Sequence, residues 1–527
     1  MFGMSKMFGM SKDGRQPSAT SGTGDSGKVE HSTLLNRQYH GNSLKVLSVR
    51  GGVFTLAAQV AQYFAQLVST AILARLLVPE SFGLIGMVVA VTGFITVFKE
   101  AGLSKATVQQ KEISHGQVSK LFWINILISL LAALAVAGLS PVIALLYSEP
   151  RLTKIAIALS GAILVSGIGI QHTAILERQM RFKALAWIKV GSILTGIATA
   201  ISLALAGAGY WALVANIIAM TTVSVIAKWV LCPWRPSLFV RHVNIGSLVR
   251  FGGNLTAGRF VNYLVRHLDD ILLGSIWGPA SLAFYSKAYS LLRLPMTAIQ
   301  NPLSSVAIPT LSKLQDRPEL FKTYYLTAMT LVVSFAMPIV GFIFMDTREI
   351  ILLMLGEQWK ESIPIVRAFV PAGLAHAVGS ATGWALLPLG RADKKLRSNV
   401  YGGMLSIICY AVGVRWGAIG VATGLSAAEV IKAFPQLSYA YRGTVLRLRD
   451  LGLAIWRPFL ASLIAIAVSQ IRQSIFGQGG IAFTLGCDAL VFSITYFIFM
   501  LYLPGGKKFR RTLLTVLRSL SRRHTDE

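Results

Sequence analysis

Apolar runs recur from one end of the chain to the other, separated by short polar connectors. A helix that crosses a bilayer needs about 20 mainly apolar residues. Connectors such as Gly207–Gly209 and Gly278–Ala280 are so short that consecutive helices must be antiparallel. We expect fourteen transmembrane helices, over residues 53–76, 82–98, 121–144, 154–174, 186–206, 210–231, 248–276, 281–310, 324–345, 363–388, 398–413, 417–440, 453–471 and 481–503. The pattern therefore predicts an all-α polytopic membrane protein.

The composition agrees with this prediction. Hydrophobic residues make up 54% of the chain and charged residues 14%, whereas about 25% of an ordinary soluble chain is charged. The formal net charge is +28, from 50 Lys and Arg against 22 Asp and Glu. These basic residues fall between apolar runs. They form neither a clustered basic patch nor a nucleic-acid-binding motif, so we expect no nucleic-acid partner. Cys232, Cys409 and Cys487 lie far apart and show neither metal-ligand spacing nor a disulfide framework.

Lysine and arginine are unevenly distributed between the two predicted membrane sides. If the amino-terminal tail is cytoplasmic, most of the basic residues fall in the tails and in the connectors of that side. Cytoplasmic connectors are enriched in Lys and Arg, so we expect both termini to be cytoplasmic. Residues 1–50 lack a signal-peptide core and have the composition of a disordered tail. Residues 506–527 form a second, basic cytoplasmic tail.

A weak internal repeat appears when the sequence is shifted by 200 residues. Pro79 then meets Pro279 and Ser81 meets Ser281, while three glutamines of the first helix meet Arg259, Asn262 and Arg266. Six helices separate the two copies, which predicts a parallel repeat like that of some transporters. We expect six-helix lobes over 51–240 and 241–445 around a central cavity, followed by two additional helices over 446–505.

Charged and polar side chains concentrate in the seventh and eighth predicted helices. Residues 259, 262, 266 and 270 share one helical stripe, because seven residues nearly complete two turns. Ionisable groups within spans are costly and mark functional sites by default. The resulting candidates for substrate binding are Arg259, Asn262, Arg266, Lys287 and Arg293, with Gln59, Gln62 and Gln66 of the first helix.

A structural role is the alternative for part of this set. Arg266 can pair with Asp270 one turn later, or with Asp269, and so hold the bundle together. Such a pair leaves the other basic residues of the stripe uncompensated. A net cationic interior suits a diphosphate or an acidic sugar and repels a cationic drug. Asp269, Asp270 and Glu100 are candidates for binding a coupling proton or sodium ion, and the sequence does not choose among them.

Other polar residues within the spans have ordinary explanations. His267 is expected to be a hydrogen-bonded packing residue, and Lys189 and Arg367 can reach the membrane surface along their own side chains. We expect the aromatic side chains Tyr263, Tyr285, Tyr289 and Trp384 to pack in the core or at the membrane interface more often than to stack on sugars. The sequence contains no nucleophile triad, metal-ligand cluster or phosphate-binding glycine loop. We therefore predict neither catalytic residues nor a cofactor.

Several segments, taken in order, resemble one family of membrane proteins. These segments are ARLLVPESFGL at 74–84, FKEAGLSKATVQQKEI at 98–113, LDDILLGSIWGPASLAFYSKAYSLLRLP at 268–295, AIPTLSKLQD at 307–316 and EIILLMLGEQW at 349–359. Over residues 45–505 the chain resembles Wzx-type polysaccharide flippases of the multidrug/oligosaccharidyl-lipid/polysaccharide superfamily, nearest the exopolysaccharide and colanic-acid branch.

The resemblance implies a fold and a function. The expected fold has two six-helix lobes that work by alternating access in the inner membrane. The implied substrate is an undecaprenyl-diphosphate-linked oligosaccharide, moved from the cytoplasmic to the periplasmic leaflet. Glycosyltransferases and a polysaccharide polymerase of the same pathway, together with membrane lipids, are the implied partners.

Three other classes of protein remain as alternatives. A lipid II flippase shares the helix count and a cationic cavity, whereas a cation-coupled drug exporter favours interior acids. A membrane glycosyltransferase or polymerase typically needs a sizeable outer loop with a catalytic side chain, and the longest outer connector, about 346–362, is short. A purely structural membrane protein would not retain so many charges within its spans.

Overall fold

The computed structural model describes residues 41–99, 103–110, 113–238, 246–476 and 480–503. Helices account for nearly all of this described part, and none of it forms a β-strand. The helices are α2 (Gly41–Leu76), α3 (Pro79–Lys99), α4 (Leu103–Gln109), α5 (His115–Leu146), α6 (Arg151–Arg178), α7 (Phe182–Leu205), α8 (Trp211–Leu231), α9 (Gly246–Ser312), α10 (Pro318–Met345), α11 (Thr347–Met354), η1 (Glu357–Trp359), α12 (Ser362–Leu386), α13 (Ala392–Gly413), η2 (Val414–Trp416), α14 (Gly417–Tyr441), α15 (Leu448–Phe476) and α16 (Ile481–Tyr502). The prediction of an all-α protein is confirmed.

Ten stretches of the described residues are long and apolar enough to cross a membrane. One of them, 392–441, contains both α13 and α14. Large apolar side chains are exposed on the helix faces, for example Leu145, Val230 and Tyr502. A soluble protein rarely exposes so much apolar surface. The chain is therefore a multi-pass membrane protein, as the sequence predicts.

The start of α2 differs from the sequence prediction. The composition of residues 1–50 predicts a disordered tail, yet α2 begins at Gly41 and continues without a break to Leu76. Polar residues such as Asn42 and Lys45 extend the helix beyond its apolar run, because a helix does not have to stop where the hydrocarbon layer ends. Residues 1–40 and 506–527, the rest of the two predicted tails, lie outside the described part.

The long helix α9 consists of two arms joined at a corner. Gly278 has φ +78° and ψ −178°, which is not helical, and Pro279 follows it. Glycine tolerates this positive φ without the steric cost that a Cβ would add. Pro279 then starts the second arm, as Pro79 starts α3, because the first helical position needs no N–H donor.

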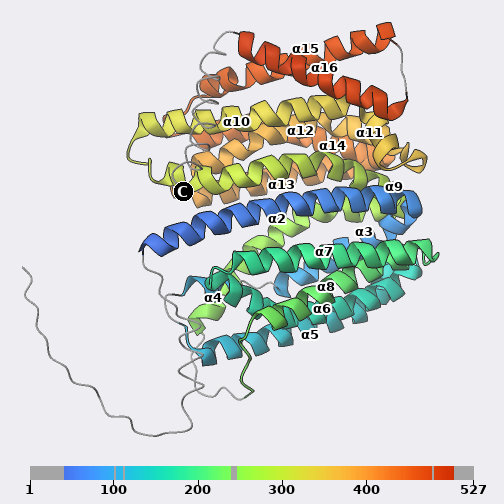
Figure 1. Ribbon diagram of the computed structural model, residues 1–527, viewed down its shortest axis with the longest axis vertical. Helices are drawn as coiled ribbons and strands as arrows, with labels where there is room; N and C mark the ends of the chain where they lie inside the picture. The colour runs from blue at the N-terminus through green and yellow to red at the C-terminus, as the bar shows by residue number, and fades with distance from the viewer. Residues whose placement is uncertain (1–40, 100–102, 111–112, 239–245, 477–479, 504–527) are drawn as a thin grey trace, which may run out of the picture.

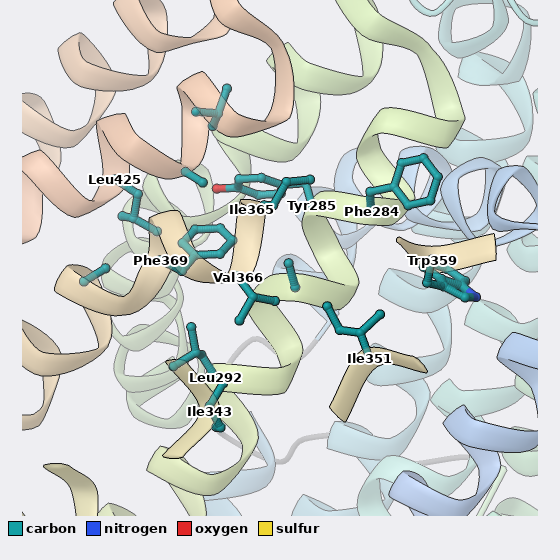
Figure 2. Close-up of a cluster of buried hydrophobic side chains, with 14 of the residues drawn as sticks. Phe284, Tyr285, Leu292, Ile343, Ile351, Trp359, Ile365, Val366, Phe369 and Leu425 are labelled. Carbon is teal, nitrogen blue, oxygen red and sulfur yellow. The ribbon is translucent and has the colours of Figure 1, made fainter. Parts of the chain in front are cut away.

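The helices lie side by side in two groups, as Figure 1 shows. The amino-terminal helices α3 and α5–α8 gather at one end of the long axis, and α10–α16 at the other, with α2 between them. One buried cluster joins α3 and α5–α8, for example Met87, Val136 and Ile155. A second joins the second arm of α9 with α10–α14, and Figure 2 shows Tyr285, Phe369 and Trp359 within it.

The last helix pair, α15–α16, is held to α10 by buried polar groups. Arg472 Nε on α15 donates to Asp488 Oδ1 on α16 at 2.8 Å. Gln473 Nε2 bridges two carboxylates, at 2.8 Å from Asp488 Oδ2 and 3.2 Å from Asp346 Oδ1. Asp346 follows the end of α10 and is fully buried. These bonds fix the added pair in one position, because buried polar groups are costly when left unpaired.

Candidate functional site

The two arms of α9 each carry an arginine deep within the bundle. Arg266 lies twelve residues before Gly278 and Arg293 fifteen after it, about 18 and 22 Å from the corner at 1.5 Å per residue. Both side chains are nevertheless exposed. Among the described residues, neither guanidinium forms an ion pair with a carboxylate. Two cations that lack a carboxylate partner within the described part of the chain therefore lie at mid-helix depth.

Both arginines approach the same residue of α12. Arg266 and Arg293 lie within electrostatic range of His376, whose side chain is exposed. Gln300, about two turns beyond Arg293, donates from Nε2 to the His376 backbone oxygen at 3.3 Å. The guanidinium of Arg293 also lies 5.7 Å from the ring centre of Tyr289. Arg293 and Gln300 are seven residues apart, so they follow the same side of the arm.

An ion pair on α14 completes this surface. Glu429 Oε1 lies 2.7 Å from Lys432 Nζ, and Lys432 Nζ lies 3.2 Å from Ser406 Oγ on α13. Glu429 acts electrostatically on His376 and on Tyr289, as the two arginines do. We call Arg266, Arg293, His376 and Lys432, with Glu429 among them, the basic surface. Its basic groups outnumber its one carboxylate, so it attracts anions.

Sequence reasoning did not single out His376, Glu429 or Lys432. A signal was present, because Glu429 and Lys432 stand three residues apart inside the apolar run 417–440. Residues at that spacing face the same side of a helix, and a charged pair inside a span is a functional candidate.

The acids of α9 have partners other than Arg266. Asp269 is buried, and its Oδ2 accepts a 2.6 Å hydrogen bond from the hydroxyl of Tyr285 on the second arm. Asp270 Oδ2 lies 3.0 Å from His267 Nδ1, and the His267 ring stacks on Tyr263. The alternative of an Arg266–Asp270 or Arg266–Asp269 pair is therefore not what the structure contains. His267 is a hydrogen-bonded, packed residue, as predicted.

The remaining predicted site residues do not all join the basic surface. Lys287 Nζ lies 4.2 Å from the ring centre of Phe82 on α3, nearer the corner of α9. On α2, Gln59 Nε2 donates to the Tyr63 hydroxyl at 3.3 Å, Gln62 is half-buried and Gln66 is exposed. No contact among the described side chains links these glutamines to the arginines. Glu100 and the side chains of Arg259 and Asn262 lie outside the described part.

The two groups of helices meet closely at the corner of α9. The backbone of Gly83 on α3 lies against Pro279, so that a Cβ at Gly83 would fall 1.8 Å from the Pro279 oxygen. Trp359 of η1 is fully buried and donates from Nε1 to the Ala74 oxygen at the end of α2, at 2.9 Å. Its ring contacts Phe82 edge-on at 5.5 Å. We call these contacts the sealed end of the bundle.

No metal or cofactor site emerges in the part of the chain that is described. It holds no group of three or more His, Cys, Asp or Glu side chains placed to bind a metal ion. The arrangement offers instead two exposed guanidinium groups and an ammonium group. Guanidinium groups bind phosphate and carboxylate oxygens in a bidentate manner. The geometry therefore suits binding of an anion rather than covalent chemistry.

A family model described as polysaccharide biosynthesis protein matches residues 72–364. The chain belongs to this family. It is 26% identical over 442 residues to the lipopolysaccharide biosynthesis protein WzxC of Escherichia coli (strain K12), covering 81% of this chain and 88% of WzxC. It is 26% identical over 307 residues to the teichuronic acid biosynthesis protein TuaB of Bacillus subtilis (strain 168), covering 57% of this chain and 63% of TuaB.

Solved structures show the same fold. The inward closed conformation of the lipid II flippase MurJ matches with a TM-score of 0.69 at 15% identity, over 88% of this chain and 100% of MurJ. An inward-facing multidrug resistance MATE family transporter of the multidrug/oligosaccharidyl-lipid/polysaccharide (MOP) superfamily matches with a TM-score of 0.60 at 15% identity. The match covers 76% of this chain and 98% of the transporter. The predicted resemblance to Wzx-type proteins is confirmed. The chain has the fold of these transporters.

Proposed function

We propose that the chain moves an undecaprenyl-diphosphate-linked oligosaccharide from the cytoplasmic to the periplasmic leaflet of the inner membrane. The glycan is destined for a lipopolysaccharide or exopolysaccharide. Membership of the polysaccharide biosynthesis protein family and the transporter fold support this proposal. Glycosyltransferases that build the repeat unit and a polymerase that consumes it are the partners it requires.

The observation that carries the proposal is the pair of exposed guanidinium groups of Arg266 and Arg293, neither of which forms an ion pair with a carboxylate of the described residues. A cation deep within a membrane protein is costly unless it faces water or binds an anion. A diphosphate is negatively charged, and its oxygen atoms can form bidentate hydrogen bonds with two guanidinium groups that come from different arms of α9. Moving the sugar head group through hydrocarbon unaided is prohibitive, and a wet basic interior removes that barrier.

The same proposal includes the fourteen-helix topology. Counting α13 and α14 separately, and adding α2 and the two arms of α9 to the apolar stretches, gives fourteen crossings. We assign residues 51–240 and 241–445 to two six-helix lobes and 446–505 to the added pair. With both termini cytoplasmic, the sealed end faces the periplasm. In that orientation we infer a state that is closed toward the periplasm and that loads substrate from the cytoplasm.

Glu429 competes with the substrate for Lys432 of the basic surface. Its carboxylate lies 2.7 Å from Lys432 Nζ. A diphosphate that reaches the surface displaces this contact, and re-formation of the contact favours release. Asp269, Asp270 and Glu100 stay as candidates for a coupling ion, and Glu429 joins them.

The test uses a strain from which the gene is deleted. We expect complete lipid-diphosphate-linked repeat units to accumulate in the inner leaflet and surface polysaccharide to be lost. The intact gene should reverse both changes, whereas Arg266→Ala and Arg293→Ala at normal expression should not. Arg415→Ala, which replaces an exposed arginine of η2, is the matched control and should restore export.

Three outcomes contradict the proposal. Normal levels of repeat unit and polysaccharide in the deletion strain mean that the substrate lies elsewhere. Accumulation of lipid II instead of a repeat unit assigns the chain to peptidoglycan synthesis. Full export by both alanine variants removes the basic surface from the mechanism.

A further inference from the structure

A second site lies between α10 and α15, at the end of the bundle away from the sealed end. It is a cavity of about 410 Å³ that also reaches the last turn of α16 at Met500. Ligand sites in proteins commonly have volumes of about 300–1,000 Å³. The cavity shares no lining residue with the basic surface. The proposed flipping reaction gives this cavity no role.

Charges of both signs line this cavity in equal number. Glu319 and Lys322 come from α10, and Asp450 and Arg457 from α15. Lys322 Nζ lies 2.7 Å from Asp450 Oδ2, which joins the two helices. The Nε atom of Arg457 is buried and has no hydrogen-bond partner among the described residues. A buried donor without a partner is costly, so Arg457 favours an acceptor that enters from outside the chain.

Hydrogen-bond acceptors stand beside these charges. The hydroxyls of Thr323, Thr327 and Thr330 each donate to a carbonyl four residues earlier, which leaves their oxygen lone pairs free. Pro458 has no N–H, so the carbonyl of Ala454, which also lines the cavity, lacks its usual helical donor. These oxygen atoms can accept from a group that carries several N–H donors.

The two carboxylates line the mouth of the cavity, whereas leucines, threonines and Arg457 line its deeper part. Glu319 and Asp450 lie in the first turns of α10 and α15, whereas Leu326, Leu331 and Leu453 lie further along them. Glu319 and Leu331 are twelve residues apart, about 18 Å of helix. One leaflet contributes about 15 Å to the hydrocarbon layer. The carboxylates therefore match the ammonium end of a lipid head group, whereas Arg457, seven residues beyond Asp450, lies at the depth of the first leucines.

We propose that this cavity binds one phospholipid whose head group carries a phosphate and a primary ammonium, that is, phosphatidylethanolamine. The phosphate binds Arg457, and the ammonium binds Glu319, Asp450 and the neighbouring oxygen atoms. Phosphatidylglycerol has no cation in its head group, so it offers no partner to Glu319 and Asp450. Phosphatidylcholine has no N–H group to satisfy the acceptors. The lipid fills the seam between α10 and the added helix pair, whatever substrate the chain transports.

The experiment is native mass spectrometry of the purified full chain in detergent. The chain is equilibrated with equal amounts of phosphatidylethanolamine, phosphatidylglycerol and phosphatidylcholine of identical acyl chains. We expect one phosphatidylethanolamine to be retained about tenfold more than either other lipid, the ratio that one charge-assisted hydrogen bond provides. Arg457→Gln and Glu319→Gln should each reduce this preference.

The matched control is Arg449→Gln, which replaces an exposed arginine at the start of α15 that does not line the cavity. It should retain the lipid as the unaltered chain does. Equal retention of all three lipids overturns the proposal, as does equal loss in the Arg449 and Arg457 variants. Displacement of phosphatidylethanolamine by a lipid-diphosphate-linked oligosaccharide also overturns it, because the cavity then belongs to the substrate path. A melting curve on each variant excludes unfolding, and Glu319→Gln stands in if Arg457→Gln unfolds.

Discussion

Replacing Gly83 by alanine should force the sealed end apart. The added Cβ would lie 1.8 Å from the Pro279 oxygen and 2.4 Å from its carbonyl carbon, and ordinary contacts begin at 3.4 Å. Both neighbours are backbone atoms at the corner formed by Gly278 and Pro279, so no side chain can rotate away. Overpacking of this kind costs about 1–3 kcal/mol. At about 1.4 kcal/mol per factor of ten, the balance between sealed and open states shifts roughly five- to 150-fold.

The assay is a distance measurement between spin labels across the sealed end. Labels at Val78 and Trp416, both exposed, are introduced after the three native cysteines are replaced. Gly83→Ala should increase the population of long distances and slow polysaccharide export. Gly138→Ala is the matched control, because beyond the backbone of its own helix no described atom lies within 4 Å of the position that its Cβ would take. An unchanged distance distribution with normal export would refute the reasoning.

Three further predictions concern single residues. Burial and the neighbouring Asp488 raise the pKa of Asp346 from 3.8 to about 7, so the folded chain holds a proton that the unfolded chain has lost. The free energy of unfolding should therefore fall by up to about 4 kcal/mol as pH rises from about 4 to about 7. Asp346→Asn should weaken the dependence of the melting temperature on pH. If the melting temperatures of the variant and the unaltered chain change with pH in parallel, this prediction is contradicted. Trp359→Phe removes one hydrogen bond to the Ala74 oxygen, which still accepts from Gln358, and should cost about 0.5–1.5 kcal/mol. Thermal unfolding measures this loss, and an unchanged melting temperature would count against the role of Trp359 at the sealed end. Glu429→Gln should tighten binding of undecaprenyl diphosphate in a direct binding assay, because Lys432 is released; weaker binding contradicts its role as a competitor.

The helices could be predicted from sequence because each apolar run must be long enough to cross the membrane. The corner at Gly278 was predictable as well, since glycine followed by proline ends one helix and starts another. Helix ends were less predictable, because polar residues such as those at 41–50 and 115–120 continue a helix outside the apolar layer.

The partners of the charged residues could not be read from spacing alone. Asp269 bonds Tyr285, sixteen residues away, only because the corner of α9 folds its second arm back on the first. Arg266 therefore pairs with neither of the two acids that follow it within about one turn. The approach of His376 and Glu429 to the arginines depends on how α12 and α14 pack against α9, which the sequence pattern does not encode.

The central claim is that a basic interior carries a lipid-linked oligosaccharide across the membrane. Its most direct test is reconstitution of the purified chain in vesicles with the repeat-unit lipid that accumulates in the deletion strain. A membrane-impermeant glycosidase reports the fraction of lipid that reaches the outer leaflet. The account predicts rapid and complete accessibility with the intact chain and the protein-free rate with an Arg266→Ala/Arg293→Ala double variant. A double variant as fast as the intact chain, or an intact chain no faster than empty vesicles, would contradict it.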